Sequence, residues 1–295
     1  MKKNQSSASA MGVAAFRAIE ATRPEAERIC YDPYARAFVP GIVYFFMKHL
    51  FVDTGLYERM ARGSMAFIIL RERYFDDFLR ACLSEGLDQV VILGVGFDTR
   101  AYRIPGIGKT RVFEIDHPAT QEVKLKKLNK IIDPLPGHVT FVPVDFNTQN
   151  LGERLQSSGY NEKGRTLFIW QGVTYFLTAE AVDHTLGFIA NHSGPGSAVI
   201  FDYFYKEVLH DPNRKEGKNL RRAAKMTGEE YLFGIDRSQV GAFLNQRGFC
   251  DVRNVTLEDL RRRYFTGPNA GRVVPDGIAI VSARVNKDGD TSCAL

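Results

Sequence analysis

Two short segments near the middle of the chain constrain the fold most strongly. The apolar run 90–93 leads into Gly94 and Gly96, which predicts a buried strand that ends in a glycine turn. The run 111–116 predicts a second strand, and it ends in Asp116. Glycine lets the backbone approach a ligand where a Cβ would collide, and an acid about twenty residues downstream accepts hydrogen bonds from ribose hydroxyls. The two segments therefore predict an α/β fold that binds a nucleoside.

Further strands follow from residue 88 onward. Short apolar runs rich in Val, Ile and Phe recur there between helical segments, as is typical of a mainly parallel sheet covered on both faces. The strands that we predict are 89–94, 111–116, 139–145, 166–170, 198–203, 249–255 and 278–285. The last two lie close together without a full helix between them, which predicts a terminal antiparallel hairpin.

The first part of the chain carries helical patterns and no good strand. Apolar residues recur at helical spacing over 12–20, 33–38 and 66–80. We therefore expect a helical N-terminal cap over residues 1–85, followed by an α/β core over residues 86–295, in one compact unit.

Composition excludes several other classes of protein. Four widely spaced cysteines, with no C-x-x-C pair or histidine cluster, argue against a zinc site or a disulfide framework, so we expect reduced thiols, no bound metal and a cytoplasmic protein. The apolar runs are too short to cross a membrane, and residues 1–20 lack an uninterrupted signal sequence. The net charge of +5 comes from dispersed basic runs without interleaved aromatics. This pattern favours solvated helix faces over a nucleic-acid surface, and it also suits an anionic small substrate.

Three features distinguish S-adenosylmethionine from a nicotinamide dinucleotide as the ligand. Thr99 stands where the dinucleotide fingerprint needs its third glycine. Glu114 and Asp116 place two carboxylates on the same side of the second strand's end, although solvated strand-end acids remain the alternative. Asp145 can accept a hydrogen bond from the adenine amine, and Phe146 can cover its ring. Together they favour the sulfonium cofactor.

Several separate motifs resemble the leucine carboxyl methyltransferase family, including its bacterial branch of O-methyltransferase-like proteins. The matching segments are 31–34, 71–79, 91–103, 113–118 and 170–177, in the family's order and spacing. The resemblance implies a class I methyltransferase with a Rossmann-like, mainly parallel seven-stranded sheet and a helical cap that closes over S-adenosylmethionine.

The resemblance also implies roles for individual residues. Arg71 matches the arginine that holds the cofactor's carboxylate, and Arg17 matches a second basic residue near it. Gln171 stands where the family usually has glutamate beside the cofactor's amino group, which predicts weaker binding rather than loss of binding, because the amide oxygen still accepts a hydrogen bond. The complete set of expected cofactor residues is Arg17, Arg71, Gly94, Gly96, Glu114, Asp116, Asp145, Phe146 and Gln171.

Candidate acceptor residues follow at later strand ends. Tyr175, Asp202 and Tyr203 lie at or near the ends of predicted strands, where α/β sheets bind ligands, although each also fits a purely structural role. Asp202 is a possible base. The polar and basic segment 205–234 predicts a lid over the acceptor.

The leading functional prediction is methyl transfer to a carboxylate or phenolic hydroxyl of a small, acidic molecule. No unmistakable general base stands out in the sequence, which favours an acceptor that is already ionised. Two alternatives remain open at this stage. One is methylation of a protein C-terminal carboxyl group, and the other is a nicotinamide-dependent oxidoreductase.

Overall fold

The computed structural model of the protein describes residues 8–145, 149–211, 214, 217–218, 220–222, 224 and 228–287. Its strands are β1 (Gln89–Leu93), β2 (Arg111–Asp116), β3 (Val139–Pro143), β4 (Thr166–Trp170), β5 (Ala198–Tyr205), β6 (Gly234–Ile235), β7 (Phe249–Thr256) and β8 (Ile278–Val285). All seven predicted strands are therefore present, with ends that shift by no more than two residues.

Helices precede, separate and follow these strands. The α-helices are α1 (Ala8–Glu20), α2 (Gly41–Phe45), α3 (Leu56–Met60), α4 (Ser64–Ser84), α5 (Arg100–Arg103), α6 (Pro118–Leu128), α7 (Leu151–Ser157), α8 (Ala179–Asn191), α9 (Lys206–His210), α11 (Val240–Asn245) and α12 (Leu257–Tyr264). Other helical turns are η1 (Ala35–Phe38), η2 (Phe46–Val52), η3 (Ile107–Lys109), η4 (Thr174–Phe176) and η5 (Gly267–Asn269). None of the helices in the described part of the chain has the length and apolar character needed to cross a membrane.

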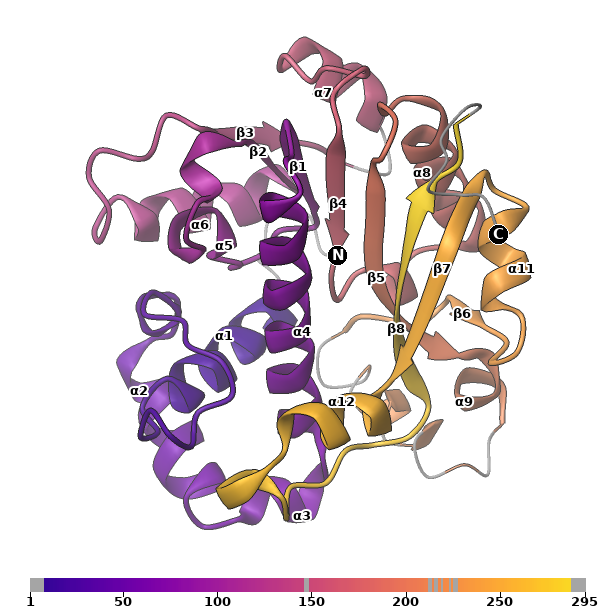
Figure 1. Ribbon diagram of the computed structural model, residues 1–295. Helices are drawn as coiled ribbons and strands as arrows, with labels where there is room; N and C mark the ends of the chain where they lie inside the picture. The colour runs from indigo at the N-terminus through magenta and orange to yellow at the C-terminus, as the bar shows by residue number, and fades with distance from the viewer. Residues whose placement is uncertain are drawn as a thin grey trace.

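The sheet has the order β3-β2-β1-β4-β5-β8-β7, and β6 pairs with β5. The pairs among β1 to β5 are parallel, whereas β8 runs antiparallel to both β5 and β7 (Figure 1). The expected mainly parallel sheet with a terminal antiparallel pair is confirmed. Two details differ. The short strand β6 adds an eighth strand to the expected seven, and α12 lies between β7 and β8 where we expected no full helix.

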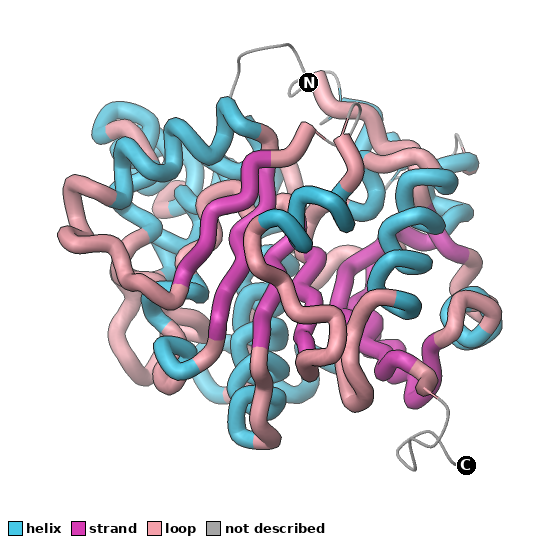
Figure 2. Tube along the Cα trace, turned by 90° about the horizontal axis from the view of Figure 1, so that it is seen from above, coloured by secondary structure: helices cyan, strands magenta, loops and turns pink. Residues whose placement is uncertain are grey.

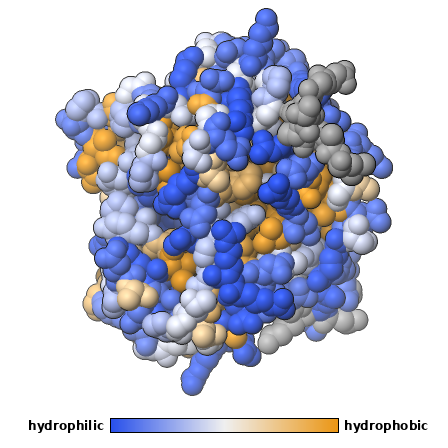
Figure 3. All heavy atoms as spheres, in the orientation of Figure 1, coloured by the Kyte–Doolittle hydropathy of each residue, from blue (hydrophilic) through white to orange (hydrophobic). Residues whose placement is uncertain are grey.

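Helices cover both faces of this sheet (Figure 2). Alternate strand residues point to opposite faces, so Val90 and Ile92 share a core with α4 and α12, while Val91 and Leu93 share another with α7, α8 and α11. The N-terminal helices therefore pack directly on the sheet. On the outer face drawn in Figure 3, hydrophobic residues form several separate areas among hydrophilic ones.

The cysteines correct one expectation. Cys30 and Cys82 are buried free thiols, but Cys250 at the start of β7 is disulfide-bonded. The spacing of cysteines along a chain does not reveal which of them meet in space, and a disulfide depends on that distance.

Candidate active site

A cavity of about 840 Å³ opens where β1, β2 and β4 end, and residues of α1 and α4 close its other side. This volume is typical of a site that encloses a small organic ligand. The expected site residues that line it are Arg17, Arg71, Gly94, Gly96, Asp116, Asp145, Gln171 and Tyr175. The tertiary structure thus brings together residues that lie up to 158 positions apart, from Arg17 to Tyr175 (175 − 17).

The glycine turn after β1 is fixed by conformation and by close packing. Gly94 and Gly96 both have positive φ, +64° and +48°. A Cβ on Gly94 would collide with the side chain of Val173, so only glycine fits there. The backbone N–H of Gly96 donates to Asp116 Oδ2 at 2.6 Å, which joins the turn to the strand-end acid.

Asp116 is held by two backbone donors. Oδ1 accepts from the N–H of His117 at 2.7 Å, and Oδ2 accepts from Gly96. Burial raises the pKa of this carboxyl group, and the two N–H donors oppose the effect. Each carboxylate oxygen keeps acceptor capacity for a further hydrogen bond, which is what a ribose diol requires.

Asp145 lies just beyond β3 and lines the same cavity. The strand ends at Pro143 rather than at Asp145, so this carboxylate belongs to the loop that follows the strand. Phe146, the expected cover for the adenine ring, lies outside the described residues, as does part of the segment 205–234 that we expected to form a lid.

Arg71 lies at the other end of the cavity, on the buried face of α4. Its Nη1 donates to Asp202 Oδ2 at 2.7 Å and to the hydroxyl of Tyr175 at 3.3 Å. Burial alone would lower the pKa of Arg71, but Asp202 and Tyr175 together outweigh burial and raise it, so the guanidinium stays charged. Its Nε is buried without a hydrogen-bond partner among the described residues. Arg71 therefore has a donor to offer to a carboxylate.

Gln171 follows β4 and contacts Glu72, the neighbour of Arg71 on α4. Its Nε2 donates to Glu72 Oε2 at 3.0 Å, while its Oε1 is buried with no hydrogen-bond partner in the described part of the chain. Because an unsatisfied buried acceptor is costly, this oxygen is suited to receive a donor from a ligand. An ammonium group is such a donor.

Glu72 belongs to a buried ion network that the sequence analysis missed. Three arginines (Arg17, Arg100 and Arg103) meet four carboxylates (Asp32, Glu72, Asp76 and Asp98). All of them are buried except Arg103, a partly buried residue whose side chain is only 4% exposed. Burial would raise the pKa of Glu72, but the arginines, led by Arg100, hold it well below its ordinary value. The Arg71-Glu72 pair within the predicted helix 66–80 was the available signal, but the sequence does not show which arginines reach Glu72.

Arg17 contributes to this network and to the glycine turn. Its Nη2 donates to the carbonyl oxygen of Phe97 at 2.5 Å, and its Nε lies 3.0 Å from Asp32 Oδ2. These contacts brace the loop that follows Gly96. A direct contact of Arg17 with the cofactor's carboxylate stays a prediction.

Glu114 does not reach the cavity, which corrects one expected cofactor residue. Its carboxylate lies 2.7 Å from Lys124 Nζ of α6, and both side chains are fully buried. Burial raises the pKa of Glu114, and Lys124 opposes the rise. Glu114 stands two positions before the end of β2, so α6 covers its side chain while Asp116 remains at the edge. Lys124 also differs from the expectation that the basic runs form solvated helix faces, because its side chain is fully buried.

Tyr203 is likewise not in the site. It points to the opposite face of β5 from Asp202, because side chains alternate along a strand, and its hydroxyl donates to Asn254 Oδ1 at 3.0 Å. Asp202 itself is fully buried beneath the cavity wall, where it accepts from Arg71 and, at 2.6 Å, from the N–H of Gly172. Among the expected acceptor residues, Tyr175 alone lines the cavity.

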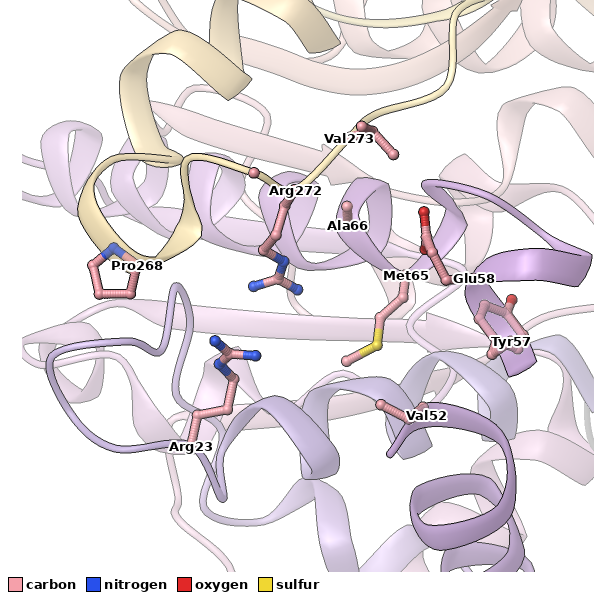
Figure 4. Close-up of a pocket in the computed structure, with 10 residues that line it drawn as sticks. Arg23, Val52, Tyr57, Glu58, Met65, Ala66, Pro268, Arg272 and Val273 are labelled. Carbon is pink, nitrogen blue, oxygen red and sulfur yellow. The ribbon is translucent and has the colours of Figure 1, made fainter. Parts of the chain in front are cut away.

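A smaller cavity of about 350 Å³ lies between α3, the start of α4 and the segment after α12. Figure 4 shows Arg23 and Arg272 directed toward each other across it. Each already has a carboxylate partner, because Arg272 Nη1 lies 3.1 Å from Glu20 Oε1 and Arg23 Nη2 lies 3.1 Å from Glu27 Oε2. None of the expected site residues lines this cavity.

The residues of the large cavity fit S-adenosylmethionine. Asp116 suits the ribose, Arg71 Nε suits a carboxylate and Gln171 Oε1 suits an ammonium group, and all three residues line one cavity. Together with the chain's relatives, this fold defines an S-adenosyl-L-methionine-dependent methyltransferase. More narrowly, the model of the family "Leucine carboxyl methyltransferase" matches residues 10–190, and the chain belongs to this family.

Individual proteins similar to this chain carry names that agree with the methyltransferase class. A Bacillus subtilis protein with the provisional name S-adenosyl-L-methionine-dependent methyltransferase YktD is 30% identical over 202 residues, which cover 67% of this chain and 66% of that protein. A Mycolicibacterium paratuberculosis protein with the same provisional activity is 30% identical over 92% of this chain and 89% of its own length. The fold resembles that of a DUF574 family protein from Streptomyces avermitilis, with a TM-score of 0.59, 12% identity, and coverage of 96% of this chain and 98% of that one. The nicotinamide alternative finds no support among these relatives.

Proposed function

We propose that this methyltransferase transfers the methyl group to an oxygen atom, either the carboxylate or a phenolic hydroxyl of a small, acidic molecule. The observation that carries the proposal is the engagement of Asp202. This aspartate was the candidate base beside the acceptor, but it is fully buried and bound to Arg71 and to the N–H of Gly172. A carboxylate, or a phenol acidic enough to be ionised at neutral pH, needs no base.

Apart from His117, whose Nδ1 accepts from the N–H of Ala119 at 3.2 Å, the titratable groups in the wall are poorly suited to deprotonate an alcohol. Burial raises the pKa of Tyr175 well above its ordinary value, so its hydroxyl stays protonated at neutral pH. The carboxylates of Glu229, Glu230 and Asp276 also line the cavity, but carboxylates as a class are weak bases for an alcohol. Arg62 places one positive charge beside these carboxylates in the same wall.

The residues of the chain would then act mainly by positioning. When bound, the cofactor supplies an activated methyl group on a sulfonium. Arg71 and Gln171 would hold the methionyl end of the cofactor, and Asp116 would hold its ribose. The methyl group would then point in one fixed direction toward the acceptor. Alignment of this kind contributes much of the rate enhancement of a displacement reaction. The buried network behind Gln171 keeps the arrangement rigid.

The test is a product analysis. Purified enzyme is incubated with S-adenosyl-L-methionine and a panel of carboxylic acids, phenols, amines and thiols, and methylated products are identified by mass spectrometry. Esters are distinguished from ethers by alkaline hydrolysis, which cleaves the ester. We expect methyl esters or aryl methyl ethers from the wild type and neither product from Asp116→Ala. Products methylated on nitrogen or sulfur alone would refute the proposal. Methylation of a peptide C-terminus, with small acids untouched, would favour the protein-directed alternative.

A further inference from the structure

Four aromatic rings form one wall of the large cavity beside Arg71. Tyr175 and Phe176 belong to η4, Phe204 to β5 and Tyr231 to the segment before β6, and all four line the cavity. We call this group the aromatic wall. Its rings contact one another directly, with centroid distances of 4.7 Å between Tyr175 and Phe176, 4.8 Å between Tyr175 and Phe204, and 5.1 Å between Phe176 and Tyr231.

The protein itself covers these rings incompletely. Tyr175 is buried, whereas Phe176, Phe204 and Tyr231 are each only partly buried although they pack at core distances. Leu177, Leu232 and Ile278 extend the same wall with apolar surface. Partly covered aromatic and apolar side chains that face a cavity are typical of the part of a site that receives the body of a ligand.

The aromatic wall lies apart from the groups suited to the nucleoside. Asp116 and the glycine turn lie at the ends of β1 and β2, whereas the aromatic wall is built from segments that follow β4 and from the end of β5. The link between the two parts is Arg71, whose Nη1 donates to the Tyr175 hydroxyl at 3.3 Å. If Arg71 holds the methionyl carboxylate, the rings lie beside the methionyl end of the cofactor, the part that carries the sulfonium.

We propose that the aromatic wall binds a planar aromatic ring of the acceptor, so that the substrates are aromatic carboxylic acids or phenols rather than aliphatic acids or peptide ends. This inference rests on the proposed oxygen methylation and narrows its substrate class. Aromatic rings prefer offset-stacked or edge-to-face neighbours at centroid distances of about 4.5–7 Å, and the half-covered rings offer such places. An aliphatic body of equal size gains burial but not this pairing.

The test compares 2-naphthoate with decahydro-2-naphthoate, which has the same carbon skeleton and carboxylate but no π system. Binding to the intact enzyme saturated with S-adenosylhomocysteine is measured by calorimetry, and ester formation with S-adenosyl-L-methionine by mass spectrometry. We expect the wild type to bind naphthoate roughly tenfold more tightly than the saturated compound. Phe176→Leu should remove most of this preference. Phe188→Leu is the matched control, since Phe188 is a partly buried phenylalanine in a ring cluster with Tyr160 and Phe168 that does not line the cavity.

The outcomes separate the two proposals. Equal affinities for the two compounds, or a preference that Phe176→Leu and Phe188→Leu reduce equally, would overturn the aromatic inference. Ester formation from both compounds at equal efficiency would overturn it as well and leave oxygen methylation standing. Selective naphthoate binding lost in Phe176→Leu, with no methylated oxygen in any product, would support the aromatic wall and count against oxygen methylation. The rings could instead contact only the sulfonium, through a cation–π interaction. In that case Phe176→Leu weakens the binding of S-adenosyl-L-methionine and leaves the affinity for naphthoate unchanged. This result would also overturn the inference.

Discussion

The side chain of Gln171 is oriented by Glu72: its Nε2 donates to Glu72 Oε2 at 3.0 Å, and its Oε1 is left buried at the cavity without a hydrogen-bond partner among the described residues. The amide has one donor side and one acceptor side, so the carboxylate behind it decides which side faces the ligand. A glutamate at position 171 would place a second carboxylate beside Glu72, so the amide of Gln171 suits the neighbour that this chain supplies.

Gln171→Leu should weaken the binding of S-adenosylhomocysteine by roughly tenfold or more, because a hydrogen bond to a charged ammonium contributes about 1.5–3 kcal/mol. Calorimetric titration of wild type and variant provides the measurement. An S-adenosylhomocysteine analogue without the amino group serves as control and should bind both proteins alike. If the variant weakens both ligands to the same extent, Gln171 does not recognise the ammonium group.

Glu72→Gln should change how stability depends on pH. Burial opposes ionisation of Glu72, but the surrounding arginines hold its pKa below the ordinary value. The ionised group therefore stabilises the fold at pH values above its unfolded-state pKa. This contribution is lost as the pH falls toward and through the lower folded-state pKa. Below about pH 4 the variant should lose stability less steeply than the wild type, by about 1.4 kcal/mol per pH unit. Urea unfolding at several pH values between 5 and 3 measures both slopes, and equal slopes would show that Glu72 does not titrate with a lowered pKa.

Asp116→Ala should reduce the affinity for S-adenosylhomocysteine on the order of a hundredfold, since it removes both acceptors proposed for the ribose hydroxyls. It also leaves the N–H groups of Gly96 and His117 without their acceptor, so a lower melting temperature is expected. Titration calorimetry tests the affinity. Asp145→Ala, in the loop beyond β3, is the comparison. Its loss of affinity for S-adenosylhomocysteine should be smaller, because a carboxylate that binds one amine makes fewer hydrogen bonds than one that binds two hydroxyls. Unchanged affinity in Asp116→Ala would remove this residue from the site.

Lys124→Met should destabilise the fold by about 3–5 kcal/mol, because it leaves the fully buried carboxylate of Glu114 without its partner. The double variant Glu114→Gln with Lys124→Met should recover much of this loss. Neither residue lines the cavity, so the affinity for S-adenosylhomocysteine should remain within a few-fold of the wild type at temperatures where the variants are folded. Chemical unfolding and calorimetry provide the two readouts, and a specific loss of affinity in Glu114→Gln would restore this residue to the cofactor site.

The sequence by itself determined the strands, their approximate ends and the glycine turn. These features depend on local patterns, because burial on both faces gives continuous apolar runs and a tight turn near a ligand needs glycine. The ends of parallel strands meet at one edge, so Gly94, Asp116 and Gln171 were expected to lie together, and the structure places all three on one cavity.

Only the tertiary structure decided which polar side chains face that cavity. Glu114 and Asp116 lie two positions apart on β2, so their side chains point to the same face of the sheet. Lys124 of α6 nevertheless pairs with Glu114, whereas Asp116 remains at the edge and lines the cavity. The link from Glu72 to Gln171 spans 99 positions, and the aromatic wall joins Tyr175, Phe204 and Tyr231 from separate segments. The physical reason is that a hydrogen bond or a ring contact depends on distances of a few ångströms between segments, whereas periodicity in a sequence reports only which face of its own element a residue occupies.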